Sequence, residues 1–224
     1  MNTLRHTPNI ASKAEKPRNT RRALLLGLGA ATLLPMLQGC FPVVATGVGA
    51  GAALVSDRRT SGTYVEDEGI EWKVSSRIRE RFGNTAHVNV TSYNRNVLLT
   101  GEAPNDTVRG ELDAIVAGVE HVRGVINEVV VGPNSALTAR GNDTLITSNV
   151  KARFVDAGRF SAHNVKVVTE ANVVFLMGIV TRAEADAAAE VARTSQGVRK
   201  VVRVFEYISD EEARRLDNPT GARR

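Results

Sequence analysis

The sequence contains an internal repeat with a period of about 75 residues, which limits the fold more than any other feature. The segment HVNVTSYNRNVLLTGEAPNDT in the first half corresponds to NVKVVTEANVVFLMGIVTRAE in the second. An offset of 77 residues aligns equivalent positions of the two copies: Val88 with Val165, Leu99 with Leu176, and Gly101 with Gly178. A repeat of this length predicts two similar structural units in tandem.

Each copy begins with the pattern of an amphipathic helix. Apolar residues recur every four positions in both copies, at Ile70, Val74 and Ile78, and at Ile146, Val150 and Phe154. This spacing is typical of the buried stripe of a helix. In the second copy we expect the helix over Leu145–Gly158, with Asn142-Asp143-Thr144 as candidates for its N-cap.

Two short strands rich in β-branched residues follow the helix in each copy, joined by turns at 93–96 and near 170–172. A second helix is expected at Asp106–Val122 and at Thr181–Ser195, and a last strand at Val125–Val131 and at Val198–Tyr207. The order of elements in each copy is therefore αββαβ. The sequence predicts an α+β fold of two αββαβ modules in tandem, each with a small three-stranded mixed sheet and two helices.

Cys40 is the only cysteine, and it closes the run Leu37-Gln38-Gly39-Cys40 after a basic and then apolar N-terminal segment. The apolar stretch Ala23–Leu37 has the length of a signal-peptide core and is too short to span a bilayer. We therefore expect a lipoprotein signal peptide, with Cys40 as the acylated first residue of the mature chain. An ordinary N-terminal membrane anchor or a short buried helix is the alternative interpretation of this segment.

The excess of basic residues belongs to the predicted signal peptide. Of the 29 basic and 24 acidic residues, 6 and 1 precede Cys40, so 23 of each remain in the mature chain. A nucleic-acid function inferred from the whole-chain charge would rest on residues that are removed, so we expect no nucleic-acid partner. The modules differ in charge, with a net charge of −4 over residues 65–131 and +2 over residues 142–208.

These patterns divide the chain into six predicted segments. They are a lipoprotein signal peptide at 1–39, a Gly/Ala-rich lipidated tether at 40–64, a first module at 65–131, a linker at 132–141, a second module at 142–208, and a charged, disordered tail at 209–224. Since no second cysteine is present, no internal disulfide can form. Each module must therefore be stabilised by burial of its own core or by packing on the other module.

Glycines at equivalent positions of the two copies carry a resemblance to a known family. The second strand of each copy runs into glycine, in VLLTG at Gly101 and VFLMG at Gly178, and a Gly-Val pair at Gly124 and at Gly197 opens the last strand region. Together with Cys40, the Gly/Ala tether and the DRRTSGT stretch at 57–63, this order resembles the outer-membrane lipoproteins that carry two BON domains, which are small αββαβ modules. The four glycines are expected to have structural roles.

The resemblance implies a non-enzymatic, lipid-anchored protein on the periplasmic face of the outer membrane that supports envelope integrity. It also implies that the second module binds an anionic phospholipid membrane, largely through its first helix. The lipid-binding candidates that it transfers are Leu145, Ile146, Lys151, Arg153 and Arg159. The alternative is a periplasmic scaffold that binds an envelope protein partner, in which lipid serves only as the anchor.

Residues that could support catalysis or bind a cofactor are not arranged in a known motif. The four histidines are scattered, and the sequence contains no nucleophile elbow, no P-loop and no GxGxxG after a strand. A metal site needs several ligands that converge. We therefore expect no enzymatic activity, no cofactor, no metal and no small-molecule substrate.

Trp72, the only tryptophan, lies on the first predicted helix, two residues from the apolar stripe position Ile70. Packing between the two modules is the favoured interpretation of this side chain. A contact with a membrane or a partner is the alternative, because an indole combines a large apolar ring with a polar tip.

Overall fold

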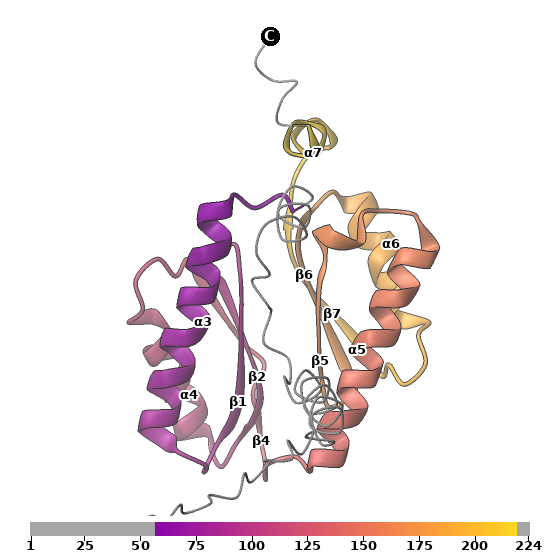
Figure 1. The fold of residues 1–224 in the computed structure, drawn as a ribbon. Coiled ribbons are helices and arrows are strands. Elements are labelled where there is room, and N and C mark those ends of the chain that lie inside the picture. The colour runs from indigo at the N-terminus through magenta and orange to yellow at the C-terminus, as the bar shows by residue number, and fades with distance from the viewer. Residues whose placement is uncertain (1–56, 219–224) are drawn as a thin grey trace, which may run out of the picture. The chain divides into compact units, whose positions relative to one another are not determined.

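The computed structural model describes residues 57–218, which contain both copies of the repeat (Figure 1). The predicted signal peptide, Cys40 and most of the predicted tether lie outside the described residues. The described elements follow in this order: α3 (Ser61–Phe82), β1 (His87–Tyr93), β2 (Asn96–Ala103), α4 (Asp106–Ala117), β3 (Gly124–Asn127), β4 (Val130–Val131), α5 (Leu137–Ala157), the short 3-10 helix Ala162–Asn164, β5 (Lys166–Glu170), β6 (Val173–Val180), α6 (Arg182–Arg193), β7 (Lys200–Tyr207) and α7 (Asp210–Asp217). Within 57–218, no helix has both the length and the apolar character that crossing a membrane requires.

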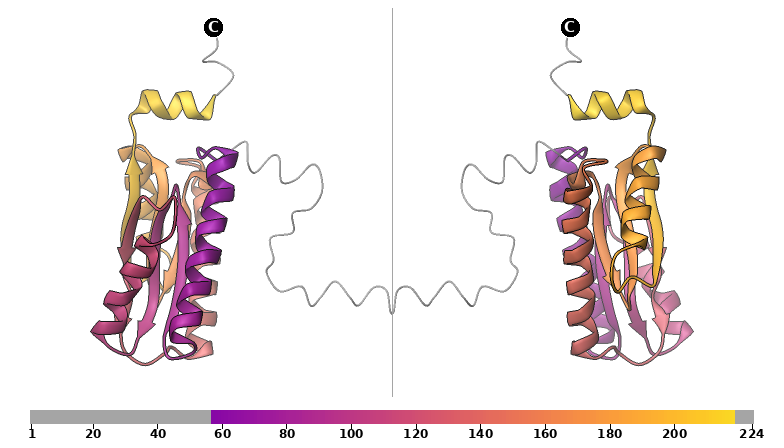
Figure 2. Two further views of the ribbon diagram at one scale, coloured as in Figure 1. Left: turned by 90° about the vertical axis from the view of Figure 1, so that its left-hand side faces the viewer. Right: turned by 90° about the vertical axis from the view of Figure 1, so that its right-hand side faces the viewer.

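The first module has the predicted αββαβ order. β1 pairs antiparallel with β2, and β2 pairs parallel with β3 and, further along, with β4. Helices α3 and α4 lie side by side on one face of this sheet (Figure 2, left). The core between helices and sheet is built from the predicted α3 stripe and from apolar residues of β2 and α4: Ile70, Val74, Ile78, Val97, Leu99, Leu112 and Val116.

The second module repeats this arrangement with a three-stranded sheet in the order β5-β6-β7. β5 is antiparallel to β6, and β7 is parallel to it. Helices α5 and α6 cover one face (Figure 2, right). The core consists of the α5 stripe, alternate residues of β5 and β6, and the alanine-rich side of α6: Ile146, Val150, Phe154, Val167, Val174, Leu176, Ala185, Ala188 and Ala192. The predicted α+β fold is therefore confirmed in both modules.

The last strand of the first module is interrupted, although the sequence predicted a continuous strand over Val125–Val131. The side-chain oxygen of Asn127 accepts a hydrogen bond from the backbone N–H of Val129 at 3.1 Å. The Val129 N–H is therefore not available for pairing with β2, and the regular pattern of hydrogen bonds between the strands is interrupted here. The chain resumes pairing with β2 at Val130, which gives the first sheet a short fourth strand.

A buried aspartate on the first helix of each module holds the following hairpin turn. Asp67 accepts hydrogen bonds from the backbone N–H groups of Asn94 and Arg95 at 2.9 and 2.7 Å. Asp143 accepts the equivalent bonds from residues 171 and 172 at 2.9 and 2.8 Å. The turn residues have positive φ angles, as a two-residue hairpin turn requires. The expected N-cap role of Asn142-Asp143-Thr144 is therefore wrong, because Asp143 lies inside α5 and binds the turn.

Several predicted boundaries differ from the structure; the helix predicted over Asp106–Val122, for example, ends at Ala117. Helix α5 begins at Leu137, inside the predicted linker, and α3 begins at Ser61, inside the predicted tether. The prediction that the tail from Ser209 is disordered is wrong for residues 210–217, which form α7. The Ser209 side chain caps this helix, acidic residues occupy its first turn and Arg214 and Arg215 its last, so that its charges complement the helix dipole.

The two modules pack sheet against sheet, on the faces that their own helices leave uncovered. Tyr93 and Leu98 of the first module form one apolar cluster with Phe175, Met177 and Ile179 of the second. Hydrogen bonds join the two modules beside this cluster, from the Asn89 side chain to Glu170, from the Asn94 side chain to Glu206 and from Lys166 to Glu71 on α3. Residues 57–218 therefore hold a third apolar core between the two module cores.

Candidate functional site

The predicted lipid-binding residues of α5 lie on different sides of the helix. Leu145 is 70% exposed, whereas its neighbour Ile146 is 4% exposed and belongs to the core of the second module. Residues one apart on a helix point about 100° away from each other, so only one of this pair can face solvent. Ile146 has a structural position, and Leu145 is the residue that the helix offers to a surface.

The three predicted basic residues also have distinct surroundings. Arg153 donates hydrogen bonds to the Val191 carbonyl at 3.1 Å and to the Ser195 hydroxyl at 2.8 Å, which ties α5 to the end of α6. Arg159 forms an exposed ion pair with Glu190 at 2.9 Å. Lys151 is exposed and makes no hydrogen bond or ion pair with any other part of 57–218. Of the three, Lys151 is the cation available to an external anion.

Two exposed apolar residues on α5 accompany Leu145 and were not among the predicted candidates. Leu137 is 81% exposed and Val155 is 69% exposed. They lie 18 residues apart, which is five complete helical turns, so they occupy the same side of α5. The sequence does not identify Leu137 as a candidate, because Leu137 lies in the segment predicted to be the linker before the helix.

The four predicted structural glycines are required to different degrees. A Cβ atom on Gly101 would lie 2.0 Å from the His87 carbonyl oxygen, and one on Gly178 would lie 2.3 Å from that of Asn164. Both are contacts with backbone that has no room to move. Gly101 and Gly197 also have positive φ angles, of 112° and 85°. Gly124 faces only the flexible end of the Asn96 side chain, at 2.8 Å.

A groove runs between α3 and α5, and we refer to it as the α3–α5 groove. It consists of three adjoining hollows of about 630, 410 and 390 Å³. The first two share His87, Asn89, Thr147 and Thr169, and the last two share Lys151. Residues of the edge strands β1 and β5 line its floor. The groove is thus open to solvent, has a mixed polar and apolar lining, and is formed by both modules.

Glu170 is a buried carboxylate at the floor of this groove. It accepts hydrogen bonds from the Asn89 side chain at 2.7 Å and from the Thr100 hydroxyl at 3.3 Å. Burial raises the pKa of Glu170; the Asn89 hydrogen bond opposes this shift and the negative charge of Glu102 adds to it. Keeping Glu170 ionised at this contact between the modules therefore costs free energy of folding.

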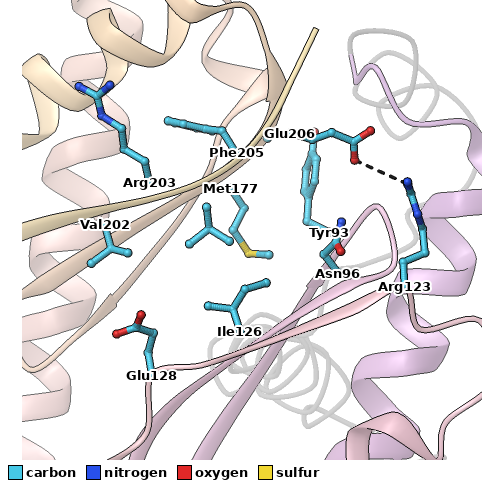
Figure 3. Close-up of a pocket in the computed structure, with 12 residues that line it drawn as sticks. Tyr93, Asn96, Arg123, Ile126, Glu128, Met177, Val202, Arg203, Phe205 and Glu206 are labelled. Carbon is cyan, nitrogen blue, oxygen red and sulfur yellow. Dashed lines mark ion pairs between the residues drawn. The ribbon is translucent and has the colours of Figure 1, made fainter. Parts of the chain in front are cut away.

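A second cavity of about 600 Å³ opens between the two sheets on the side of β3 and β7 (Figure 3). Ile126, Met177 and Val202 point into it, and an ion pair of 3.6 Å between Arg123 and Glu206 lies at its rim. β3 and β7 are edge strands, so the backbone groups on their outer sides do not take part in either described sheet. The cavity therefore combines an apolar interior with two open strand edges.

The fold and these surfaces define a protein made of two small αββαβ modules joined through their sheets. The chain belongs to the BON-domain family, because the BON domain matches residues 66–133 and again residues 142–209. These matches cover more than half of the chain, and they confirm the predicted family resemblance.

Several curated proteins are similar to this chain over most of their length. Outer membrane lipoprotein DolP of Haemophilus influenzae is 39% identical over 188 residues, which are 83% of this chain and 95% of that protein. The 21 kDa hemolysin of Actinobacillus pleuropneumoniae is 37% identical over 154 residues, 68% and 79% of the two chains. Osmotically-inducible protein Y of Escherichia coli is 27% identical over 160 residues, 70% and 80% of the two chains.

Proposed function

We propose that this protein is an outer-membrane lipoprotein, anchored through Cys40, whose second BON module contacts anionic phospholipid and supports the integrity of the cell envelope. The similarity to a protein named outer membrane lipoprotein DolP and the signal-like N-terminus support the anchor and its location. The proposed role is one of binding and positioning, not catalysis.

The observation that carries the lipid contact is the exposed apolar side of α5. Leu137, Leu145 and Val155 all project from a helix whose opposite side already supplies a complete core stripe. Exposed leucine and valine near a lysine on a surface helix are side chains that can enter the headgroup region of a bilayer. Lys151 lies on the same helix and supplies the charge that an anionic headgroup would attract.

Binding to vesicles tests this proposal. Residues 56–224 without the lipid anchor are expected to co-sediment with vesicles that contain phosphatidylglycerol and much less with pure phosphatidylcholine. Lys151→Glu is expected to weaken binding about 30-fold, because reversing one charge near the surface changes the binding free energy by about 2 kcal/mol. Lys200→Glu is the matched control, since it makes the same charge change on the exposed start of β7.

The proposal fails if binding does not depend on the anionic lipid or if Lys151→Glu and Lys200→Glu have equal effects. Leu145→Ala should weaken binding with no change in thermal stability, because the side chain is outside the core. Thermal unfolding of each variant separates a loss of lipid contact from a loss of structure.

A second candidate function is a protein-interaction scaffold in which lipid serves only as the anchor. The cavity between β3 and β7 favours it, because open strand edges beside an apolar interior suit an extended peptide segment. This candidate predicts that the unanchored fragment does not bind vesicles but retains a specific envelope protein in a pull-down. Val202→Asp, on the partly exposed wall of the cavity, should then abolish that interaction without a change in thermal stability (Figure 3).

A further inference from the structure

Trp72 is the most exposed aromatic side chain among the described residues, and its position has no explanation in the fold. It is 71% exposed on α3, and Val65, seven residues earlier on the same side, is exposed as well. The core stripe of α3 lies on the opposite side, at Ile70 and Val74. Packing between the modules, the favoured sequence interpretation of Trp72, is therefore wrong. An indole left in water on one side of a helix indicates a contact that forms outside the chain.

Trp72 lies at the rim of the α3–α5 groove. Glu68, four residues earlier, lines one hollow of the groove, and Ser75, three residues later, lines another. Residues three and four apart share a side of a helix, which places Trp72 between them at the groove edge. Lys151 and Val155 of α5 line the same hollow as Glu68 from the other side.

The charges around the groove favour an anionic surface. Arg79 and Lys151, one from each module, line the groove and make no side-chain ion pair within 57–218. Lys166 is paired with Glu71 at 2.8 Å, and the carboxylates Asp143 and Glu170 are buried and accept hydrogen bonds. Glu68 is an exposed acid on the same edge. The unpaired charges that reach the surface here are thus mainly positive, although the first module as a whole has a net charge of −4.

The chain enters the folded part beside this groove. Asp57, the first described residue, lines the same hollow as Lys151 and Val155. Sixteen residues, 41–56, separate it from Cys40, and none of them is charged. An extended chain of that length spans at most about 60 Å. A lipid on Cys40 would therefore hold this end of the groove within reach of the bilayer.

We propose that Trp72 is a membrane contact on the first module, so that α3 and α5 meet an anionic phospholipid bilayer together across the groove. This inference rests on the proposed function of α5 and extends it to the other module. Trp72 enters the headgroup region, where tryptophan side chains are enriched. Arg79 and Lys151 face the lipid phosphates from the two rims.

The single tryptophan allows a direct test. The full lipidated chain is reconstituted into vesicles of phosphatidylglycerol and phosphatidylcholine in equal amounts, with and without bromine on the lipid acyl chains. Trp72 emission is expected to shift to shorter wavelength and to be quenched by the brominated lipid. Both effects should decrease in pure phosphatidylcholine, where the anchor alone holds the protein.

A matched variant reports on the second module. Trp72→Phe combined with Val155→Trp moves the only tryptophan from α3 to Val155, which is 69% exposed and lines the groove from α5. Quenching of both proteins supports the two-helix contact. Quenching of the Val155→Trp variant alone overturns the role of Trp72 and leaves the proposed function intact. Quenching of Trp72 alone, or of neither reporter, overturns the contact by α5 and with it the joint surface.

The charges give a second readout. Arg79→Ala is expected to weaken the anionic-lipid dependence of Trp72 quenching about fivefold, which corresponds to one basic group near the surface. Lys73→Ala, on α3 but paired with Glu120, is the control. Equal effects of the two variants would overturn the assignment of Arg79 to the groove rim.

Discussion

Arg58 and Asp217 lie 159 residues apart in the sequence and are joined by two hydrogen bonds of 2.9 Å. The Arg58 side chain is 2% exposed and also donates to both carboxylate oxygens of Glu184 and to the Ile179 carbonyl. Burial opposes the charge of Glu184, but the hydrogen bonds from Arg58 and from the Thr181 backbone lower its pKa. One arginine thus connects the entry of the folded chain with β6, α6 and the C-terminal helix.

Removing this arginine should destabilise the protein. Arg58→Ala is expected to lower the free energy of unfolding by about 2 kcal/mol, because it leaves the half-buried Glu184 carboxylate and the buried Ile179 carbonyl without their donor. Thermal or urea unfolding measures the loss. Arg214→Ala, on the exposed side of α7, is the control and should change stability by less than about 0.5 kcal/mol. Similar losses in both variants would contradict the role of Arg58.

The pKa of Glu170 predicts a pH dependence of stability. Because its pKa is raised in the folded state, the folded protein binds the proton more tightly than the unfolded chain does. Its contribution to stability is therefore complete below the unfolded pKa and is lost as pH rises through the raised folded pKa. Glu170→Gln keeps an oxygen that can accept from Asn89 and removes the charge. We expect the Glu170→Gln variant to have a higher Tm than the wild-type protein at pH 7 and nearly the same Tm near pH 4. A lower Tm of the variant at pH 7 would exclude this explanation.

The close approach of strands at Gly101 predicts that alanine is tolerated much less well there than at a glycine with free space around it. Gly101→Ala should cost more than about 3 kcal/mol, since its Cβ would overlap the His87 carbonyl and its φ angle of 112° is unfavourable for alanine. Gly110→Ala is the matched control inside α4, where a Cβ meets nothing within 4 Å. That variant should gain up to about 1 kcal/mol from helix propensity. Equal destabilisation of both would rule out the steric argument.

Arg153 is predicted to support stability more than lipid binding. Arg153→Ala removes the donor to Val191 and Ser195 and should cost about 1 to 2 kcal/mol. The vesicle binding of folded Arg153→Ala protein should decrease much less than that of the Lys151→Glu variant. Paired measurements of Tm and co-sedimentation check this division, and a binding defect at unchanged Tm would show instead that Arg153 contacts lipid.

Lipidation at Cys40 predicts the distribution of the protein between cell fractions. Cys40→Ser removes the thiol that would carry the lipid, and the weak net charge of the second module should not replace a multiply acylated anchor. The variant should move from the membrane to the soluble fraction on fractionation. Retention in the membrane at the wild-type level would show that the tether is not the main anchor.

The fold was predictable because its signals are local and occur twice. The α3 and α5 stripes, the alternation in β2 and β6 and the close-approach positions Gly101 and Gly178 can all be read from residues near each other in the chain. Helix starts were less predictable. Asp143 resembled an N-cap by composition, yet it binds a hairpin turn 28 residues further on.

The sequence predicted which helix carries the candidate site, but not which residues of that helix are exposed. The sequence indicated α5 but placed Leu145 and Ile146 on one surface, and it treated three basic residues as equivalent. The tertiary structure separated them, because neighbours on a helix point in different directions and because α6 supplies partners to Arg153 and Arg159.

The order of residues alone indicates two αββαβ modules, their family and a candidate anchor at Cys40, since periodicity and repetition need no knowledge of distant contacts. Three features follow only from the folded chain: Trp72 faces solvent, residues 210–217 form a helix, and Arg58 joins the two ends of the described segment. The difference lies in the range of the interactions. A hydrophobic stripe records that a side is buried, whereas an ion pair between residues 159 positions apart leaves no pattern along the chain.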